Sequence, residues 1–587
     1  MNEIIIGIDL GTTNSEVAIV GQGKVRVIAD GDKKILPSFV GIDDHGNILV
    51  GETAKNQYLV YPERTVKSIK RLMGQNIQID LAGQSYAPQE ISAIILKRLK
   101  AIAEKDLGQP VGKAVITVPA YFSDVQRQAT REAGEIAGLE VVRMINEPTA
   151  AALAYGASQA EAKRMLVYDL GGGTFDVSVV NIQAGVVEVL SSHGDNHLGG
   201  DDFDQQIIEH LLRHLQNTYH VDARAHSKAM ARITRAAENA KILLSDQPYA
   251  QIEEEYLLEH DGSAIHLSLE LSRLEYEAMI EDYINATLDA VHIALKGAKL
   301  TAADIDEVIL VGGSTRTPCI RERLFSEFGF EPHGEVDPDL CVAMGAAIQA
   351  AMIGGQQVDT VLVDVTPYTY GTSAIGTLNG EFYPFMFVPV IHKNSVLPSR
   401  KTDAFMTSHD GQEFVDVSIY QGEDPDALNN TLIGEFRVEG LRDVSAGNVI
   451  TLTLDLDLNG ILHVSAQEKA TGLEKSIVIK NALSRFESAA LDTARQRITS
   501  LFGHLESNPD ELGEPEPFEA PAAAPEIEAA RNAMARAESL FEQVSDSDKE
   551  DMVDLIGTIT ACIKANDIEG LKEPVDQLND IIYYLES

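Results

Sequence analysis

The stretch YDLGGGTFDVS, from Tyr168 to Ser178, places three glycines between two strand-like runs, with an aspartate on each side. Residues 6–20, IGIDLGTTNSEVAIV, repeat the same pattern when Asp9 is set on Asp169. Each copy is an apolar strand, a glycine-rich turn and a second alternating strand, which predicts a β-hairpin. An internal repeat of this kind indicates two copies of one structural unit.

The repeated hairpin indicates a phosphate-binding site. A glycine turn lets backbone N–H groups converge on an anion with no Cβ in the way. The carboxylate that ends the first strand, Asp9 or Asp169, cannot bind phosphate itself but can hold a hydrated cation that does. At the matching position of the second strand, Glu16 falls on Asp176. Two such hairpins facing each other would hold a polyphosphate and its Mg²⁺ from both sides.

Length and composition indicate a soluble protein of several domains. With 587 residues the chain is too long for one core, and about three or four domains are expected. The net charge of −43 argues against nucleic-acid binding, which needs a basic surface. The simplest interpretation of this charge is solubility.

Cysteine usage and the lack of long apolar runs indicate a cytoplasmic protein. Cys319, Cys341 and Cys562 fit neither a metal-binding spacing nor a disulfide framework, so we expect reduced thiols. The apolar start at Ile4–Ile8 is interrupted by Asp9 and has no basic flank, which disfavours a signal peptide. No run approaches the roughly 18 apolar residues of a membrane span, so no membrane partner is expected.

Residues 1–358 alternate strand and helix patterns, which is typical of an α/β domain. The clearest strand candidates are Ile4–Ile8, Val115–Val118, Leu166–Tyr168 and Val308–Val311. The clearest helical patterns are Val125–Gly138 and Ser272–Lys296. A third strand followed by glycines, VILVGGSTRTP, opens toward a helix after Val308–Val311.

The pattern changes at residues 359–365, DTVLVDV, where apolar residues lie between aspartates. They are either one more buried strand or a linker that docks into a groove in one state and is exposed in another. From 366 to 480 the helical period disappears, and short alternating runs such as Phe414–Gly422 predict an antiparallel sandwich. Another run, Thr451–Gln467, contains Asn459-Gly460 as its turn.

Helical periodicity returns after Leu483. An apolar stripe from Leu491 to Leu505 predicts one helix, and the proline-rich stretch 513–525 then interrupts it. Three further stripes begin at Ile527, Met552 and Leu571, which predicts a small three-helix bundle. Residues 481–587 hold 23 acidic and 8 basic residues, a balance of −15, so the bundle surface should be strongly anionic.

Seven motifs carry a resemblance to a known family. They are DLGTTNS, VPAYFSDVQRQAT, INEPTAAALAYG, DLGGGTFDVS, LGGDDFD, ILVGGSTR and the linker VLVDVTP, in that order. On these motifs the chain closely resembles the DnaK-type, 70-kilodalton heat-shock chaperone family, in detail to about residue 480 and in pattern beyond. The resemblance implies an α/β, actin-like ATPase domain of two lobes (1–358), an interdomain linker (359–365), an antiparallel β-sandwich that binds extended apolar peptides (366–480) and a C-terminal helical lid (481–587).

The resemblance also implies a site for ATP or ADP with Mg²⁺, and allows K⁺ as an additional ion. Lys70 matches the lysine beside the attacking water, and Asp9, Glu147 and Asp169 match the carboxylates that order the water shell of Mg²⁺. The catalytic set is Lys70, Glu147, Asp169 and Thr174. The matched nucleotide-binding residues are Asp9, Gly11, Thr12, Thr13, Asn14, Gly171, Gly172, Gly173, Thr174, Asp176, Gly199, Gly200, Asp201, Glu238, Lys241, Ser245, Gly312, Gly313, Ser314, Arg316 and Asp339.

Each of these residues also has an ordinary alternative. Read singly, Lys70 is a solvated lysine and Glu147 a charge at a helix start. The chain has no Gly-x4-Gly-Lys-Ser/Thr loop, so it is not a P-loop ATPase. His193 and His197 lie four apart beside Asp195, but this stretch matches a family loop, which disfavours a metal site.

By resemblance, ATP binding draws the linker into a groove on the ATPase domain, and peptide is then released quickly. The residues matched to this coupling are Pro119, Arg127, Arg143, Val361, Leu362, Val363 and Asp364. Burial of the three apolar linker side chains and pairing of Asp364 with a cation near Arg143 would favour docking. The residues matched to the peptide cleft and its arch are Ile375, Phe405, Ser408, Val415, Val417 and Ile419. Alternating core is the other interpretation of the last three.

The resulting hypothesis is an ATP-driven chaperone for unfolded or client polypeptides, with a J-domain cochaperone and a nucleotide exchange factor as partners. The alternatives are a chaperone for special clients, such as iron–sulfur assembly proteins, a small-molecule kinase of the same ATPase fold, and an exchange-factor relative that binds ATP without turnover. The segment between Arg71 and Gln89 is short for the family, and Glu381–Ile391 adds aromatic residues near the cleft. With the ending YYLES, these departures favour a specialised bacterial paralogue.

Overall fold

The computed structural model describes residues 4–21, 23–156, 162–333, 337–356, 360–441, 445–478 and 488–506; beyond 506 it describes 572–586 and a few single helical positions. The chain divides into two compact units, 1–504 and 505–587, which are treated separately below. Within the described residues, no helix is long and apolar enough to cross a membrane.

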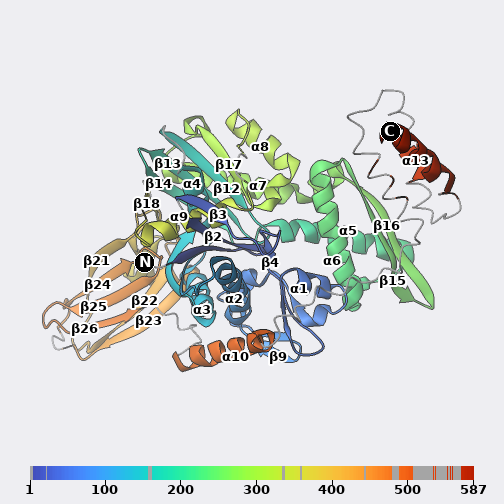
Figure 1. Ribbon diagram of the computed structural model, residues 1–587. Helices are drawn as coiled ribbons and strands as arrows, with labels where there is room; N and C mark the ends of the chain where they lie inside the picture. The colour runs from blue at the N-terminus through green and yellow to red at the C-terminus, as the bar shows by residue number, and fades with distance from the viewer. Residues whose placement is uncertain are drawn as a thin grey trace. The chain divides into compact units, whose positions relative to one another are not determined.

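Two mixed β-sheets lie at the centre of the first 363 residues (Figure 1). The first has the order β11-β10-β1-β2-β3, with β4 paired to β2; the second has the order β17-β12-β13-β14-β18. The strands of the first sheet are β1 (Ile5–Leu10), β2 (Asn14–Gly21), β3 (Lys24–Val27), β4 (Leu36–Pro37), β10 (Lys113–Val118) and β11 (Glu140–Asn146). Those of the second are β12 (Lys163–Leu170), β13 (Phe175–Gln183), β14 (Val186–Asp195), β17 (Glu307–Val311) and β18 (Val361–Val363).

The repeat seen in the sequence is a structural repeat. In each sheet an antiparallel hairpin, β1–β2 or β12–β13, is followed by a parallel neighbour, β10 or β17. Asp9 pairs across the first hairpin with Glu16, and Asp169 pairs across the second with Asp176. The predicted hairpins and the α/β organisation are therefore confirmed.

Helices cover these sheets and complete two lobes. The first lobe is built on the sheet that contains β1, and the second lobe on the sheet that contains β12. The helices are α1 (Glu52–Tyr58), α2 (Pro88–Leu107), α3 (Asp124–Ile136), α4 (Glu147–Gly156), α5 (Gly200–Tyr219), α6 (Ser227–Asp246), α7 (Arg273–Ala298), α8 (Pro318–Phe328) and α9 (Cys341–Ile353), with the short 3-10 helix η2 (Ile69–Leu72). The small sheets are β5 (Val40–Ile42), β6 (Ile48–Val50) and β7 (Thr65–Val66); β8 (Ile79–Leu81) and β9 (Gln84–Tyr86); and β15 (Tyr249–His260) and β16 (Ser263–Ser272).

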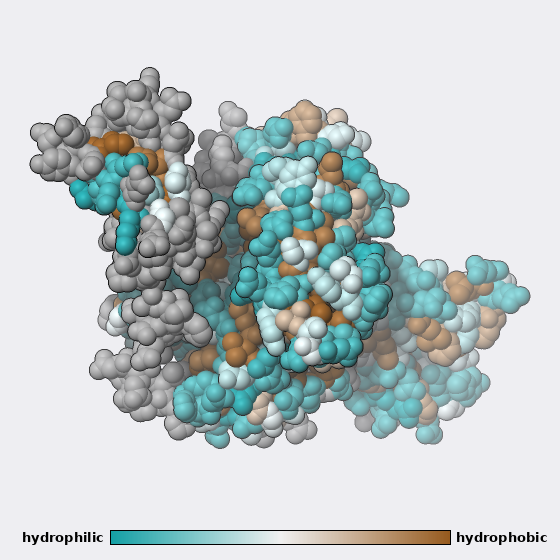
Figure 2. All heavy atoms as spheres, turned by 90° about the vertical axis from the view of Figure 1, so that its right-hand side faces the viewer, coloured by the Kyte–Doolittle hydropathy of each residue, from teal (hydrophilic) through white to brown (hydrophobic). Residues whose placement is uncertain are grey.

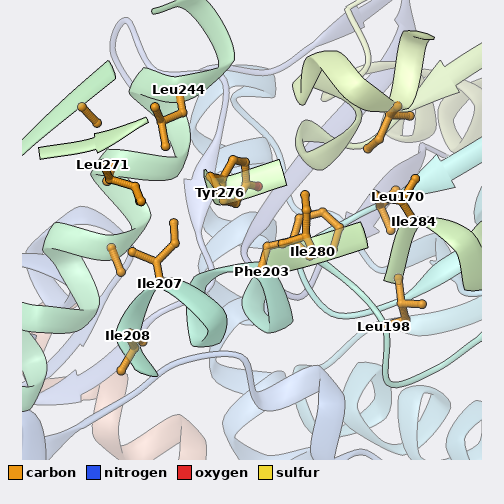
Figure 3. Close-up of a cluster of buried hydrophobic side chains, with 14 of the residues drawn as sticks. Leu170, Leu198, Phe203, Ile207, Ile208, Leu244, Leu271, Tyr276, Ile280 and Ile284 are labelled. Carbon is orange, nitrogen blue, oxygen red and sulfur yellow. The ribbon is translucent and has the colours of Figure 1, made fainter. Parts of the chain in front are cut away.

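One large hydrophobic core holds the second hairpin, β12–β13, in place. Leu170, at the end of β12, and Leu198, just before α5, belong to the same buried cluster as Phe203, Tyr276 and Ile280 of α5 and α7 (Figure 3). Burial of such side chains stabilises a protein by roughly 1.5–3 kcal/mol each. The glycine turns at the ends of these strands are therefore anchored on a rigid base.

Two four-stranded antiparallel sheets follow the linker and share one core of alternating side chains. Their orders are β20-β19-β22-β23 and β21-β24-β25-β26. The strands are β19 (Tyr370–Leu378), β20 (Glu381–Ile391), β21 (Ser399–Met406), β22 (Phe414–Gln421), β23 (Thr431–Glu439), β24 (Val449–Leu456), β25 (Leu462–Glu468) and β26 (Glu474–Val478). The predicted antiparallel strands and the turn at Asn459-Gly460 are confirmed.

The linker strand β18 lies parallel to β14 at the edge of the second sheet (Figure 1). Val361, Leu362 and Val363 pair with Val186, Val187 and Glu188. The segment is thus both a strand and a docked linker. One expectation is wrong in part: Val361 stays 56% exposed, because an edge strand buries only one of its faces.

The helix α10 (Ser488–Glu506) follows the second of these sheets, and its predicted stripe is confirmed where Ala494 and Ile498 are buried. In the second unit, α13 (Lys572–Glu586) buries Leu578. The predicted proline-rich break at 513–525 lies outside the described residues. On the face shown in Figure 2, hydrophilic residues predominate and apolar ones are scattered, in keeping with the net charge of −43.

Candidate functional site

The two glycine turns meet face to face between the lobes. A Cβ built on Gly172 would lie 1.9 Å from Thr13 Oγ1, and one on Gly173 would lie 2.7 Å from Thr12 Cγ2. Gly199, just before α5, packs equally closely on the backbone of Gly172. A side chain at Gly172 or Gly173 would collide with the threonines of the facing turn, so only glycine fits there. The two turns thus form one cradle, as expected for a phosphate site.

A buried cluster of acids surrounds a single lysine beside this cradle. Lys70 on η2 forms an ion pair with Glu147, the first residue of α4, and both side chains are at most 10% exposed. Asp9 accepts a hydrogen bond from Thr117 Oγ1 at 2.6 Å. Burial and the charge of Glu147 raise the pKa of Asp9 to about 7, while Lys70 opposes the shift.

Asp169 lies in the same cluster and carries an unpaired atom. Its Oδ2 is buried and has no hydrogen-bond partner among the described residues. Burial, followed by the charge of Glu147, raises the pKa of Asp169 well above its ordinary value. Because these carboxylates would repel one another when ionised, the cluster fits a divalent cation held through its water shell.

Asp176 and Glu16 occupy equivalent positions but have different surroundings. Asp176 accepts hydrogen bonds from the backbone N–H groups of Ala120 (3.1 Å) and Tyr121 (3.0 Å), and so joins the two lobes. Glu16 is 2% exposed, and burial and the charge of Asp9 raise its pKa well above the ordinary value. The sequence repeat aligned Glu16 with Asp176, but it did not predict that Glu16 would be buried beside Asp9.

Residues of α5, α6 and the loop after β17 form a second wall. Lys241 pairs with Asp204 at 2.8 Å and donates to the carbonyl of Gly200 at 3.1 Å. Ser314 Oγ donates to the carbonyl of Gly171 at 2.9 Å. Arg316 pairs with Asp339 at 2.8 Å. The structure therefore brings Ser314 to the second glycine turn from 143 positions away, and Lys241 to the neighbouring Gly200.

Ion pairs also close the cleft between the lobes. Lys55 on α1 pairs with Glu238 on α6 at 3.2 Å, so Glu238, a predicted nucleoside contact, also bridges the lobes. Arg71 pairs with Asp202 at 3.0 Å and donates to the carbonyl of His197 at 3.0 Å. Arg71 was missed in the sequence, because an arginine next to Lys70 has no pattern that reveals a partner 131 positions away.

Three of the predicted coupling residues, Pro119, Arg127 and Asp364, are connected by one chain of contacts. Arg127 donates to the carbonyl of Ala120 and to Asn146 Oδ1, both at 2.8 Å. Asn146 Nδ2 donates to Asp364 Oδ2 at 3.0 Å, and Thr149 Oγ1 donates to the same atom at 3.3 Å. Pro119 lies at the start of this chain, since its carbonyl is 3.5 Å from an Arg127 nitrogen.

Asp364 is buried, and its polar partners differ from the expected cation. Burial raises the pKa of Asp364, whereas the N–H of Val365 and the charges of Arg127 and Arg143 oppose the shift. Arg143 acts at a distance: its Nε is buried with no hydrogen-bond partner among the described residues. The direct contacts come instead from Asn146 and Thr149, which the sequence analysis did not single out.

Two residues that flank the first antiparallel sheet of the sandwich contact the lobes. They are Tyr368, before β19, and Lys393, after β20. The Tyr368 hydroxyl donates to the carbonyl of Tyr121, and their rings lie 4.6 Å apart. Lys393 Nζ lies 3.3 Å from His193 Nδ1 and 5.5 Å from the Tyr121 ring centre. His193 therefore belongs to this interface, and its ring also packs edge-on against Tyr121.

The predicted peptide-site residues separate into core and surface. Ile419 and Val417 are buried in the sandwich core, whereas Phe405 and Val415 are only partly buried against it. Ile375 is 56% exposed, and Ser408 is exposed with its N–H bonded to Gln412 Oε1 at 3.0 Å. For Val417 and Ile419 the alternating-core interpretation therefore accounts for the burial.

The sheet also has an open seam near these residues. Among the described strands, β19 pairs with β22 only through Tyr370, Gly371 and Thr372, and the part of β22 from Phe414 to Ser418 pairs with β23 alone. Thr372 Oγ1 donates to the carbonyl of Ser418 at 2.8 Å, at the end of the ladder. Beyond that point no ladder joins the described parts of the two strands, so an extended chain could pair with their backbone there.

The helix α10 lies against the first lobe (Figure 1). Arg497 pairs with buried Glu90 of α2, donates to the carbonyl of Ser85 at 3.3 Å and stacks 4.6 Å from the Tyr86 ring centre. Lys97 Nζ donates to Thr499 Oγ1 at 3.0 Å. The helical stripe predicted this helix, but not the lobe on which it docks.

Comparisons with known proteins agree with this arrangement. The model of the Hsp70 protein family matches residues 5–586. The Chaperone protein DnaK of Thermosipho africanus is 47% identical over 485 residues, covering 81% of this chain and 80% of its own. The Chaperone protein DnaK of Thermotoga neapolitana is 46% identical over 486 residues, with the same coverage.

Proposed function

Because the chain belongs to the Hsp70 family and is an ATP-dependent molecular chaperone with ATPase activity, we propose a specific role for each part of the molecule. Residues 1–358 form an actin-like ATPase domain, 359–365 the linker, 366–480 the peptide-binding sandwich, and 481–587 a helical lid. The pairing of the linker strand β18 with β14 carries this proposal, because it connects the phosphate hairpin and the linker within one sheet.

The two glycine turns bind the phosphates of ATP through backbone N–H groups. Gly11 to Asn14 act from the first lobe and Gly171 to Thr174 from the second, and their close approach supports this role. Asp9, Glu147 and Asp169 would hold Mg²⁺ through its water shell, and the bound ion would supply positive charge to the phosphate oxygens. The buried Oδ2 of Asp169, which has no hydrogen-bond partner among the described residues, fits such an ion, and burial with the charge of Glu147 raises the pKa of Asp9.

The nucleoside lies against the second wall. Glu238, Lys241 and Ser245 of α6 bind it from one side, and Gly313, Ser314 and Arg316 from the other. The remaining members of the wall are Gly199, Gly200, Asp201, Gly312 and Asp339, which hold the backbone of the cradle together.

Lys70 and Thr174 act on the reacting γ-phosphate. Lys70 is the buried cation of the acidic cluster, so it can orient the attacking water and offset negative charge. Thr174, 7% exposed at the glycine turn, can donate a hydrogen bond to the γ-phosphate. Glu147 holds Lys70 in place through their ion pair. Little covalent chemistry is required, because phosphoryl transfer depends mainly on positioning and charge.

The linker couples the ATPase domain to the sandwich. Asp176, at the phosphate hairpin, binds the backbone of Tyr121, whose carbonyl in turn accepts the Tyr368 hydroxyl at the start of the sandwich. Arg127 and Asn146 connect the same loop to Asp364. A coupling of about 1–3 kcal/mol through these contacts would change peptide affinity roughly 5- to 150-fold.

Client polypeptides bind in the open seam between β19 and β22. Phe405 and Val415 supply a partly exposed apolar wall, and Ile375 and Ser408 lie on the surface beside it. Val417 and Ile419 hold the floor from the core side. A J-domain cochaperone and a nucleotide exchange factor are the expected partners. The free thiols of Cys319 and Cys341 suit a reducing cytoplasm.

The test is ATP turnover measured with and without an unfolded apolar peptide and a J-domain protein. We expect both to stimulate turnover, since each promotes the linked cycle of hydrolysis and capture. A phosphorylated metabolite as product would instead support a kinase, and ATP bound without turnover would support a non-cycling exchange factor.

The variant Asp364→Ala tests the coupling within the same assay. It removes the acceptor of Asn146 and Thr149 but leaves the nucleotide site untouched, so ATP affinity by calorimetry should not change. Peptide stimulation of turnover should fall several-fold. Stimulation equal to that of the wild type would exclude a docking role for Asp364.

A further inference from the structure

The aromatic stretch Glu381–Ile391 forms a ribbon that extends beyond the sandwich. β19 and β20 pair from Tyr370–Ile391 to Leu378–Glu381, whereas β19 reaches β22 only as far as Thr372. The residues beyond therefore form a two-stranded ribbon, closed by Asn379 and Gly380 with φ of 54° and 86°. Two positive φ values are typical of the type I′ turn, which favours a tight, regular hairpin.

The base of the ribbon is firmly held. Phe387 packs in a small buried cluster with Tyr420 and Ala427, and its N–H donates to the carbonyl of Pro425 at 2.9 Å. Tyr383 Oη donates to Asp426 Oδ2 at 2.9 Å. An isolated two-stranded ribbon is marginal in water, so these contacts fix its position.

One face of the ribbon carries exposed apolar side chains. Phe382 pairs with Thr377, which lies two residues from Ile375 on the same strand, so Phe382 and Ile375 share a face. Phe382 is 74% exposed and Ile375 56%. Tyr420 pairs with Gly371, so this face points away from the sandwich core, in which Ile419 is buried.

Two further apolar side chains continue this face. Leu432 pairs with Tyr420 and is 47% exposed, and Leu428, in the 3-10 helix η6 (Ala427–Asn429), is 57% exposed. We call Phe382, Leu428 and Leu432 the outer stripe; Ile375, already assigned to the seam, lies between the two. Rigid, exposed aromatic and aliphatic side chains of this kind are typical of binding surfaces.

The charges around the outer stripe are acidic. Glu381 lies at the ribbon tip, Asp424 and Asp426 lie before η6, and Glu435 shares the face through its pairing with Ser418. Arg437, on the same face, is already paired with Asp416 at 2.6 Å. A partner of the outer stripe should therefore be apolar with basic flanks.

This charge disfavours three possible occupants. A second copy of the chain would bring the same acidic rim against itself. Residues 481–587 of the same chain carry a balance of −15. Anionic membrane surfaces would also be repelled. The ribbon continues β19, the strand that borders the proposed peptide seam, by six residues, or roughly 20 Å at about 3.3 Å per residue.

We propose that the outer stripe is a second client-binding surface, which takes an apolar, lysine- or arginine-flanked stretch of the same polypeptide that occupies the seam. The inference rests on the proposed function of the seam. It predicts that clients are recognised over a longer stretch than a single central pocket could contact, and that the aromatic insertion selects for a basic, apolar extension.

The test compares two fluorescent peptides by anisotropy on the full chain with ADP. One is a seven-residue apolar peptide, and the other adds a ten-residue apolar tail containing lysines. Wild type should bind the longer peptide about tenfold more tightly, as expected when two exposed apolar side chains become buried. Phe382→Ser with Leu428→Ser should reduce that advantage to about twofold or less and leave the short peptide's affinity unchanged.

Controls distinguish the possible failures. Phe325→Ser, at a half-exposed aromatic on α8, should keep the full advantage of the longer peptide. A tail with glutamates in place of lysines should lose it. An unchanged advantage in the double variant, or equal binding of the acidic tail, would overturn the inference. Failure of wild type to bind the short peptide would instead overturn the proposed seam and, with it, this inference.

Discussion

At the scale of single residues, the site depends on one lysine among several buried acids. Lys70 is 4% exposed and paired with Glu147, and its charge opposes the rise that burial causes in the pKa of Asp9 and Asp169. A charge held in a water-poor cleft costs no reorganisation when the reaction occurs, so it contributes more there than in solution. This explains why a residue that looks like a surface lysine in the sequence lies at the centre of the cleft.

We expect Lys70→Ala to lower the rate of ATP cleavage about 10²- to 10³-fold, as loss of one preorganised charge does in other sites. ATP affinity should change only a few-fold, because the glycine turns bind the phosphates independently. Single-turnover kinetics and calorimetry measure the two quantities. Lys67→Ala, on the same segment, is the matched control, since Lys67 lies over the Tyr58 ring and outside the cleft. A rate within tenfold of wild type would remove Lys70 from the mechanism.

At the scale of elements, the packing of the sandwich on the lobes is sensitive to protonation. His193, on β14, lies between Lys393, Tyr121 and Asp195, with Glu423 near Lys393. Burial, followed by the charge of Lys393, lowers the pKa of His193 from 6.5 to about 4. The docked state therefore prefers the neutral ring, and docking is fully favoured above pH 6.5 and lost progressively as pH falls toward 4.

We expect docking to be about tenfold weaker at pH 5.5 than at pH 7.5, because a ring with an ordinary pKa of 6.5 is then mostly protonated when undocked. Hydrogen exchange at Val361–Val363, corrected for intrinsic rates, reports the docked population. His193→Asn should flatten this dependence, whereas His197→Asn should preserve it. A pH dependence that persists in His193→Asn would assign the effect to another group.

At the scale of the whole first unit, the sandwich and α10 each dock on the lobes through a small set of contacts. The linker and Tyr368 belong to the first set, and Arg497 with Glu90 of α2 belongs to the second. Both depend on side chains far apart in sequence, and both are small compared with the lobe cores. Such modest interfaces are suited to a molecule that must separate its parts during each cycle.

We expect Arg497→Ala to increase opening of α10 about fivefold, because a partly exposed arginine bonded to a buried carboxylate contributes roughly 1 kcal/mol. Fluorescence transfer between labels on α10 and α2 in the presence of ATP measures this opening. The double variant with Glu90→Gln should be no more open than Arg497→Ala alone. Strictly additive effects would show that the two side chains do not act on each other.

The sequence alone determined the local elements and the chemistry of the loops. The repeat of Asp9 and Asp169, the glycine turns and the alternating strands of the sandwich all follow from short-range patterns, because backbone geometry and side-chain periodicity are local. The coupling residues Arg127 and Asp364 came from family resemblance. Their connection through Asn146 did not, since no local pattern identifies that asparagine.

Only the tertiary structure decided which distant residues come into contact and which remain exposed. Burial of Glu16 beside Asp9, the bridge from Arg71 to Asp202, the contact of His193 with Lys393 and the exposure of Phe382 depend on how distant strands and helices pack. Side-chain burial, pKa and charge pairing are properties of the assembled surroundings, not of the local chain. For this protein, short-range patterns gave the parts of the site, and long-range packing set their charges, their partners and the face left free for binding.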